Sequence, residues 1–142
     1  MESNLARRWR WWLKNYGRST LAIAATLGWM AVTLLFLGSS DPPAPEAGSL
    51  PIALLGHLVL FGVLGFLASV TATTVSRSRR WVLPLVVSVL VGVLWGLFTE
   101  WYQTTLPGRS ASLEDVLIDS AAAFAGGMVA GAVQLLAVSQ GK

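Results

Sequence analysis

Four long blocks of the chain carry almost no charge, and this feature limits its fold more than any other. The blocks are Thr20–Gly38, Leu50–Ser76, Trp81–Thr99 and Val116–Gln140, and the only charged residue within them is Asp119. Each block exceeds the roughly 18 residues that mark a membrane-spanning helix, because about 20 residues, each rising about 1.5 Å, cross a hydrocarbon layer of about 30 Å. A core helix of a water-soluble protein would show a polar face, which these blocks lack.

The sequence therefore predicts an all-α membrane protein whose four transmembrane helices form one compact bundle. Helices are favoured over strands, because an isolated apolar strand would leave its backbone N–H and C=O groups unpaired in lipid. The expected helices are about Ser19–Gly38, Pro51–Val75, Trp81–Thr104 and Leu113–Val138. The first connection contains three prolines, which end the helix and favour an extended connector, and "LPGR" at 106–109 is typical of a turn.

The first residues read "ARRWRWWLKNYGR", in which cations alternate with tryptophans. We interpret residues 1–18 as a basic, aromatic flank of the first helix, residues 19–138 as the transmembrane domain and residues 139–142 as a tail. An amphipathic segment that binds anionic lipid is the alternative interpretation of the flank. An uncleaved anchor is favoured over a signal peptide, because no small-x-small cleavage site follows the apolar run.

The positions of the charges predict a topology. The chain has ten Lys and Arg and a net charge of +3, which alone would be compatible with nucleic acid as a partner. Nine of the ten lie in residues 1–18, in residues 76–80 or at Lys142, and Arg109 is the exception. The positive-inside rule then places both termini and the second loop in the cytoplasm, and the first and third loops outside. The absence of cysteine from the sequence excludes disulfides and thiol chemistry.

The acidic residues are concentrated elsewhere: four of the seven lie between Thr99 and Ser120. With the predicted topology, polar residues from three helices fall at one depth, near the outer surface of the membrane. The candidate binding residues are His57, Glu100, Gln103, Arg109, Ser112, Asp115 and Asp119. An ionised side chain at a helix centre costs about 2.5–3.5 kcal/mol, so such residues usually face a protein interior and a partner. Arg109, the only cation on this side, is the expected partner of the carboxylates.

Small residues continue the polar faces along three helices, at about 100° per residue. The predicted interior faces are Ser88, Gly92, Gly96, Thr99, Glu100 and Gln103; Asp115, Asp119, Ala122, Ala123, Gly126 and Ala130; and His57, Phe61, Leu64 and Gly65. Small residues let helices approach closely in lipid, and both Gly92–Gly96 and Gly127–Gly131 are GxxxG pairs. The second pair lies off the Asp119 face and is available for a second contact or a homo-oligomer.

Simpler explanations exist for several of these residues. Ser112 and Asp115 have the spacing of a capping box, and Glu114 points away from the Asp115 face and is expected to be solvated. Glu100 and Gln103 also fit the place where the third helix leaves the membrane. Asp119 is too deep for any surface explanation.

The run Glu100-x-x-Gln103, Pro107-Gly108-Arg109, Ser112-x-x-Asp115 and Asp119 resembles the VanZ-like family of small bacterial membrane proteins. The segment "GHLVLFGVLG", with His57 and Phe61, resembles the His-x-x-x-aromatic segment of that family. The resemblance covers about 39–131. Two positions depart from the pattern, because Asp119 stands where the family usually has Asn, and Ala122 where it usually has Gly. The resemblance implies a multi-pass protein of the bacterial cytoplasmic membrane and a role in resistance to glycopeptides such as teicoplanin.

Three functions remain open at this point, and binding is favoured over catalysis. The site could bind an anionic envelope lipid, a peptidoglycan precursor or a lipoglycopeptide antibiotic. It could belong to an enzyme that acts on a lipid-linked envelope substrate, with His57 and a carboxylate as acid and base. It could also serve only helix packing or assembly. No cofactor, metal or nucleic acid is expected, and a transporter is disfavoured because no helix is broken at mid-membrane.

Overall fold

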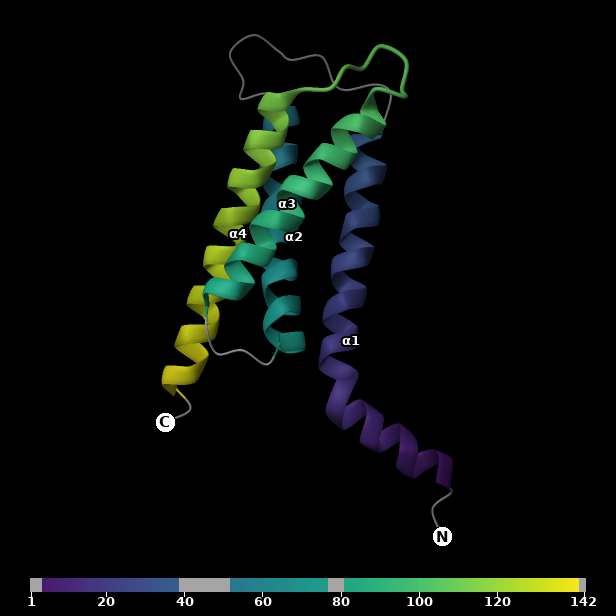
Figure 1. Ribbon diagram of the computed structural model, residues 1–142, viewed down its shortest axis with the longest axis vertical. Helices are drawn as coiled ribbons and strands as arrows, with labels where there is room; N and C mark the ends of the chain where they lie inside the picture. The colour runs from purple at the N-terminus through teal and green to yellow at the C-terminus, as the bar shows by residue number, and fades with distance from the viewer. Residues whose placement is uncertain (1–3, 39–51, 77–80, 141–142) are drawn as a thin grey trace.

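The computed structural model describes residues 4–38, 52–76 and 81–140. Four helices follow one another: α1 (Asn4–Leu37), α2 (Ile52–Ser76), α3 (Val82–Gln103) and α4 (Leu113–Gln140) (Figure 1). The proline-rich connector and the basic turn expected between the first three helices lie outside the described residues.

All four helices are long and apolar enough to cross a membrane. Their boundaries agree with the predicted ones to within two residues, except at the start of α1, which begins at Asn4 inside the predicted flank. The flank contains no proline, and its Arg, Lys and Leu residues are good helix formers, so the helix continues through it. Figure 1 shows that this N-terminal part of α1 turns away from the bundle.

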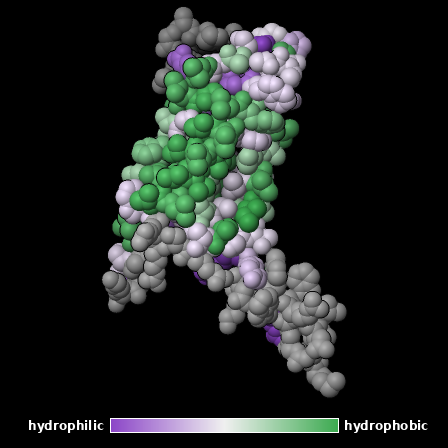
Figure 2. Space-filling view, in the orientation of Figure 1, coloured by the Kyte–Doolittle hydropathy of each residue, from purple (hydrophilic) through white to green (hydrophobic). Residues whose placement is uncertain are grey.

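Polar and apolar residues are distributed as expected for a protein surrounded by lipid. Large apolar side chains are exposed, with Leu35 77% and Leu21 72% accessible, whereas Thr99 and Asp119 are fully buried. Figure 2 shows a broad apolar belt across the middle of the visible face. A soluble protein would not expose so large an apolar surface. The exposed belt and the four spans therefore indicate a multi-pass membrane protein.

Helices α2, α3 and α4 pack closely because small residues face one another. A Cβ atom at Gly65 would overlap the backbone of Ala123, and one at Gly126 would overlap the Gly62 carbonyl. Gly92 similarly faces Ala123. The interior faces predicted for the three helices are the buried faces, and the first GxxxG pair is used within the chain.

Helix α1 packs mainly against α2 and is joined to the bundle by polar contacts. Trp29 Nε1 donates to the Leu60 carbonyl at 2.8 Å, and Trp95 Nε1 of α3 donates to Thr33 Oγ1 at 2.6 Å. Such interhelical hydrogen bonds stabilise bundles in lipid, where the alternative is an unpaired polar group.

Both chain ends lie at the same end of the bundle (Figure 1). The opposite end is formed by the last turns of α1 and α3 and the first turns of α2 and α4, and is called the site end below. The side of the membrane on which the site end lies stays a prediction from the charge pattern.

Candidate functional site

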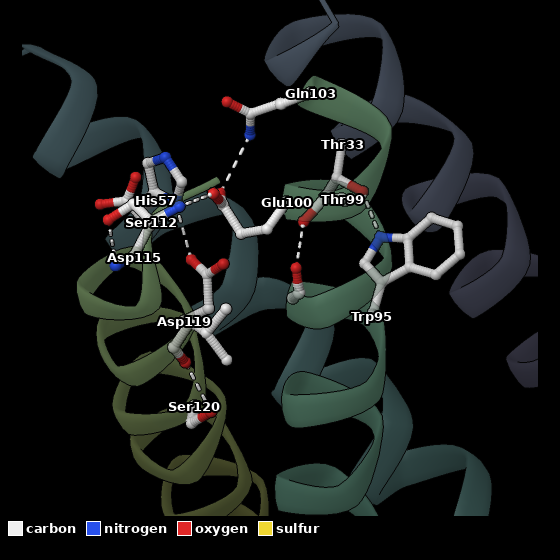
Figure 3. A network of polar contacts seen from close by, with 12 residues as sticks. Thr33, His57, Trp95, Thr99, Glu100, Gln103, Ser112, Asp115, Asp119 and Ser120 are labelled. Atoms are coloured by element: carbon white, nitrogen blue, oxygen red, sulfur yellow. Dashed lines mark hydrogen bonds and ion pairs between the residues drawn. The ribbon is translucent and has the colours of Figure 1, made fainter. Parts of the chain in front are cut away.

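The structure brings the seven predicted site residues to the site end. They come from the second turn of α2, the last turns of α3, the α3–α4 turn and the first two turns of α4, and six of them are labelled in Figure 3: His57, Glu100, Gln103, Ser112, Asp115 and Asp119. Segments far apart in the sequence thus place their polar groups in one layer, as the predicted depths require.

His57 and Asp119 form a buried pair between α2 and α4. His57 Nδ1 lies 2.8 Å from Asp119 Oδ1, and the side chains are only 8% and 0% accessible (Figure 3). Phe61 stacks on the imidazole with nearly parallel planes, one helical turn along α2. The carboxylate fits against α3 because Gly96 has no side chain: a Cβ there would lie 3.3 Å from Asp119 Oδ2. Asp119 Oδ2 is buried and has no hydrogen-bond partner among the described residues.

Glu100 joins the end of α3 to the start of α4 through both of its carboxylate oxygens. Oε1 accepts a hydrogen bond from Gln103 Nε2 at 3.1 Å, and Oε2 accepts one from the backbone N–H of Ser112 at 2.6 Å. The negative carboxylate at the N-terminus of α4 also interacts favourably with the helix dipole. Glu100 therefore has a structural role in the site, and both of its oxygens are occupied.

Ser112 caps α4 as predicted, because its Oγ accepts a hydrogen bond from the Asp115 N–H at 3.1 Å. In a complete capping box the Asp115 carboxylate would in turn accept the Ser112 N–H. Glu100 accepts that N–H instead. No described residue hydrogen-bonds the partly exposed Asp115 carboxylate, and the neighbouring Glu114 is exposed as predicted.

Arg109 is held by neutral oxygens and not by carboxylates. Its Nη2 donates to Gln103 Oε1 at 2.7 Å and to the Leu37 carbonyl at 3.1 Å, while Nε is buried and unpaired. Within the described part of the chain no carboxylate pairs with Arg109, which differs from the pairing expected from sequence. The reason is that the amide of Gln103 lies between Arg109 and Glu100, whose oxygens are already bonded.

A tight turn directs Arg109 toward α1. Gly108 has φ of 74°, a left-handed conformation that glycine adopts without the cost that a side chain imposes. The Arg109 N–H bonds back to the Leu106 carbonyl at 3.3 Å, which closes the turn. The chain thereby reverses just before Arg109, as predicted for the "LPGR" segment.

The polar layer consists of two groups that are linked through Glu100 and Gln103. The acidic group contains the His57–Asp119 pair, with Glu100 and Asp115 within electrostatic range of His57. The basic group contains Arg109 with its Gln103 and Leu37 acceptors. The polar side chains meet as predicted, but as a chain of contacts and not as a shell around one guanidinium. The described residues include no group of three or more His, Asp or Glu side chains that could hold a metal ion.

The Leu37 carbonyl is the site component that sequence reasoning missed. It belongs to the last residue of α1, where the final carbonyls have no acceptor role within the helix. A cation is favoured at a helix C-terminus by these carbonyls and by the helix dipole. The end of the first apolar block therefore indicated that a cation could be bound there, but nothing in the sequence connected this position with Arg109.

Comparisons with known proteins test the resemblance found in the sequence. Searches of curated proteins and of solved structures gave no match. The sequence model of the VanZ/LLP1 family matches residues 7–134, nearly the whole chain, and therefore includes all four helices and every site residue described above. The chain belongs to the VanZ/LLP1 family.

Proposed function

We propose that this protein binds an anionic group of an envelope lipid, a peptidoglycan precursor or a lipoglycopeptide at the site end. In this proposal the site end faces outward from the bacterial cytoplasmic membrane, and binding contributes to resistance to glycopeptides such as teicoplanin. The family membership and the four spans support the location, and the geometry of Arg109 supports the ligand class.

The observation that carries the proposal is that no carboxylate of the described residues pairs with the Arg109 guanidinium. Both of its described acceptors are neutral oxygens, from Gln103 and Leu37. Its buried Nε–H has no acceptor among the described residues, and an unmade hydrogen bond of this kind costs about 1–3 kcal/mol. A phosphate or carboxylate of a ligand would supply the missing negative charge, because the planar guanidinium fork binds such groups bidentately.

Arg109 is also held in place before a ligand arrives. Glu100 fixes the amide of Gln103, and Gln103 presents its oxygen to Nη2, while the end of α1 supplies the second acceptor. A side chain that is already ordered loses less conformational entropy on binding. The basic group is therefore suited to recognise an anion and not only to close the turn.

Catalysis is the second candidate, and the His57–Asp119 contact is the specific observation that favours it. A carboxylate bonded to one imidazole nitrogen orients the other nitrogen as an acid or base. A turnover assay with purified protein and a lipid-linked peptidoglycan precursor separates the candidates. Product formation that is lost in His57→Gln would assign catalysis, whereas binding without turnover supports our proposal.

The binding test uses purified protein in detergent and short-chain phosphatidylglycerol, which offers a phosphate with a net negative charge. Arg109→Gln should weaken binding about tenfold or more, since hydrogen bonds to charged groups contribute about 1.5–3 kcal/mol. Arg109→Lys keeps the charge but loses the planar fork, and should bind with intermediate affinity. The matched control is Arg18→Gln, which removes an exposed arginine from α1, about five helical turns before the end of the helix at Leu37. Equal affinities for the native protein and Arg109→Gln would overturn the proposal.

A second experiment connects binding with the cellular role. Cells that express the native protein or Arg109→Gln are compared for teicoplanin susceptibility and for the abundance of the protein in the membrane. A loss of resistance at unchanged abundance is the expected result. A loss that follows reduced abundance would indicate that Arg109 serves packing.

A further inference from the structure

Glu100 takes the place of the Asp115 carboxylate in the helix cap, and no described residue donates to that carboxylate. Ser112 and Asp115 have the spacing of a reciprocal box, yet Glu100 from α3 accepts the Ser112 N–H. The partly exposed Asp115 therefore presents its charge at the surface of the acidic group, with no described hydrogen-bond donor directed to it. The helix cap does not require a carboxylate at Asp115, since the Ser112 hydroxyl already accepts a backbone N–H of the first turn.

The His57–Asp119 pair presents a second acceptor in the same group. When the imidazole is neutral and its proton lies on Nδ1, where Asp119 accepts it, Nε2 carries a lone pair. No described residue donates to Nε2, although His57 is only 6% exposed. Asp119 is fully buried, and no described residue donates to its Oδ2. A buried carboxylate oxygen normally has a hydrogen-bond partner.

Apart from the donors that Glu100 and Asp119 Oδ1 already use, no described residue donates to the carboxylates of the acidic group, and no described Lys or Arg pairs with them. The carboxylates of Glu100 and Asp115 lie within electrostatic range of His57, and Asp119 is in direct contact with it. The nearest described guanidinium, Arg109, is bonded to the far side of Gln103. A primary ammonium has three N–H donors and no acceptor, so it complements a site of this composition. A metal ion fits less well, because the described side chains do not form a metal-binding set.

We propose that the acidic group binds a primary ammonium, and that the ligand is an amine-bearing phosphate of the phosphoethanolamine class. The phosphate lies at Arg109 and the ammonium lies between Asp115 and Nε2 of His57. Glu100 and Gln103 connect the two groups through consecutive hydrogen bonds at one end of the bundle. This inference rests on the proposed anion site and specifies the class of molecule that fills it.

The experiment compares three short-chain phospholipids with the purified protein. Phosphatidylethanolamine and phosphatidylcholine share the phosphate and the net charge, but only the first has ammonium N–H donors, whereas phosphatidylglycerol has no amine. The expected result is that phosphatidylethanolamine binds about tenfold more tightly than phosphatidylcholine, since charged hydrogen bonds have about this effect on affinity. Asp115→Asn should remove that preference and leave phosphatidylglycerol binding unweakened.

Glu114→Gln is the matched control, because it removes the same charge from the adjacent exposed position. It should keep the preference for phosphatidylethanolamine. Asp115 is the variant of choice because it is partly exposed and Ser112 still caps the helix. Asp119→Asn is the second variant: it keeps the shape of the side chain and an acceptor for His57 but lowers the negative charge, so it should reduce the preference several-fold.

Soluble phosphoethanolamine, added as a competitor, distinguishes two sources of the same chemistry. Competition as strong as that of the short-chain lipid supports the inference and assigns the ligand to a soluble headgroup. Competition by the lipid alone supports it and assigns the ligand to the membrane.

Equal affinity for phosphatidylethanolamine and phosphatidylcholine, with no selective effect of Asp115→Asn, would overturn this inference. The proposed anion site would still stand if Arg109→Gln weakened phosphatidylglycerol binding. If Arg109→Gln had no effect on phosphatidylglycerol, the anion site itself would be wrong.

Discussion

Asp119 has no access to solvent and lies within a membrane-spanning helix, in contact with His57. An ionisable group in such a position is expensive unless it is paired. The position has two further features, a glycine opposite the carboxylate and an aromatic ring stacked on the imidazole. The glycine and the aromatic ring each hold the His57–Asp119 pair in one geometry. We therefore expect the packing of α2 against α4 to depend on this pair.

Substitution of Asp119 tests this dependence. Asp119→Asn should keep the fold, because the amide has the same shape and its oxygen can accept the His57 proton. Asp119→Leu leaves a buried donor unpaired, at a cost of about 1–3 kcal/mol. That cost should lower the melting temperature by about 5 °C or more. Intrinsic tryptophan fluorescence during heating in detergent measures the melting temperatures of both variants. Equal melting temperatures for Asp119→Leu and the native protein would contradict the account.

Single residues show what the sequence could and could not predict about the site. The depth of Asp119 and the absence of charge around it were sufficient to predict a buried partner. The partner of Arg109 was not predictable in the same way, because three carboxylates and one amide lie on nearby segments. The choice depends on the left-handed turn at Gly108 and on which oxygens Glu100 has already used. These are properties of side-chain geometry, which spacing along a chain does not determine.

At the scale of helices, side-chain size decides which faces meet. Helices α2 and α4 approach each other through glycine at Gly65 and Gly126, where an added Cβ would overlap the facing backbone. Gly131, in the second GxxxG pair, has no atom within 4 Å of such a Cβ. Gly126 and Gly131 thus belong to the same helix, but only Gly126 is packed closely against another helix of the chain.

Alanine substitution separates the two positions. Gly126→Ala should destabilise the bundle by about 1–3 kcal/mol, the usual cost of overpacking, because the obstructing atoms belong to the α2 backbone and cannot move freely. Gly131→Ala should have no measurable effect on the monomer. Unfolding of both variants in mixed detergent micelles provides the comparison. Similar losses for the two variants would indicate that Gly131 is packed against a second chain.

A helix boundary was predictable from the sequence where the apolar block and the helix end at nearly the same residue. This is the case near Gln103 and Leu113, where a turn follows or precedes an apolar block. It is not the case at the start of α1, because arginine and lysine end the apolar block but favour the helix. The charges at residues 7–18 therefore mark the predicted membrane boundary and not the end of the helix.

At the scale of the whole molecule, the arrangement of the four spans follows from the sequence, whereas the orientation remains a prediction. The even number of spans explains why the start of α1 and the end of α4 lie at the same end of the bundle. The excess of cations in residues 1–18 and 76–80 predicts that this end is cytoplasmic. The absence of cysteine from the sequence allows a direct test with single introduced thiols.

Thr105→Cys places a thiol in the exposed α3–α4 turn, and Ser139→Cys places one in the exposed last turn of α4. In intact cells a membrane-impermeant maleimide should label the first and not the second, because the site end is predicted to face outward. Both should be labelled once the cells are opened. The reverse pattern in intact cells would place the site in the cytoplasm and exclude an extracytoplasmic ligand.

The most direct measurement is an experimental structure of the protein in a bilayer that contains phosphatidylethanolamine and phosphatidylglycerol. The account predicts density for a phosphate within hydrogen-bond distance of the Arg109 guanidinium, with Gln103 and Leu37 still bonded to Nη2. A structure with ordered lipid elsewhere, in which Nε instead pairs with a carboxylate of the protein, would contradict the account.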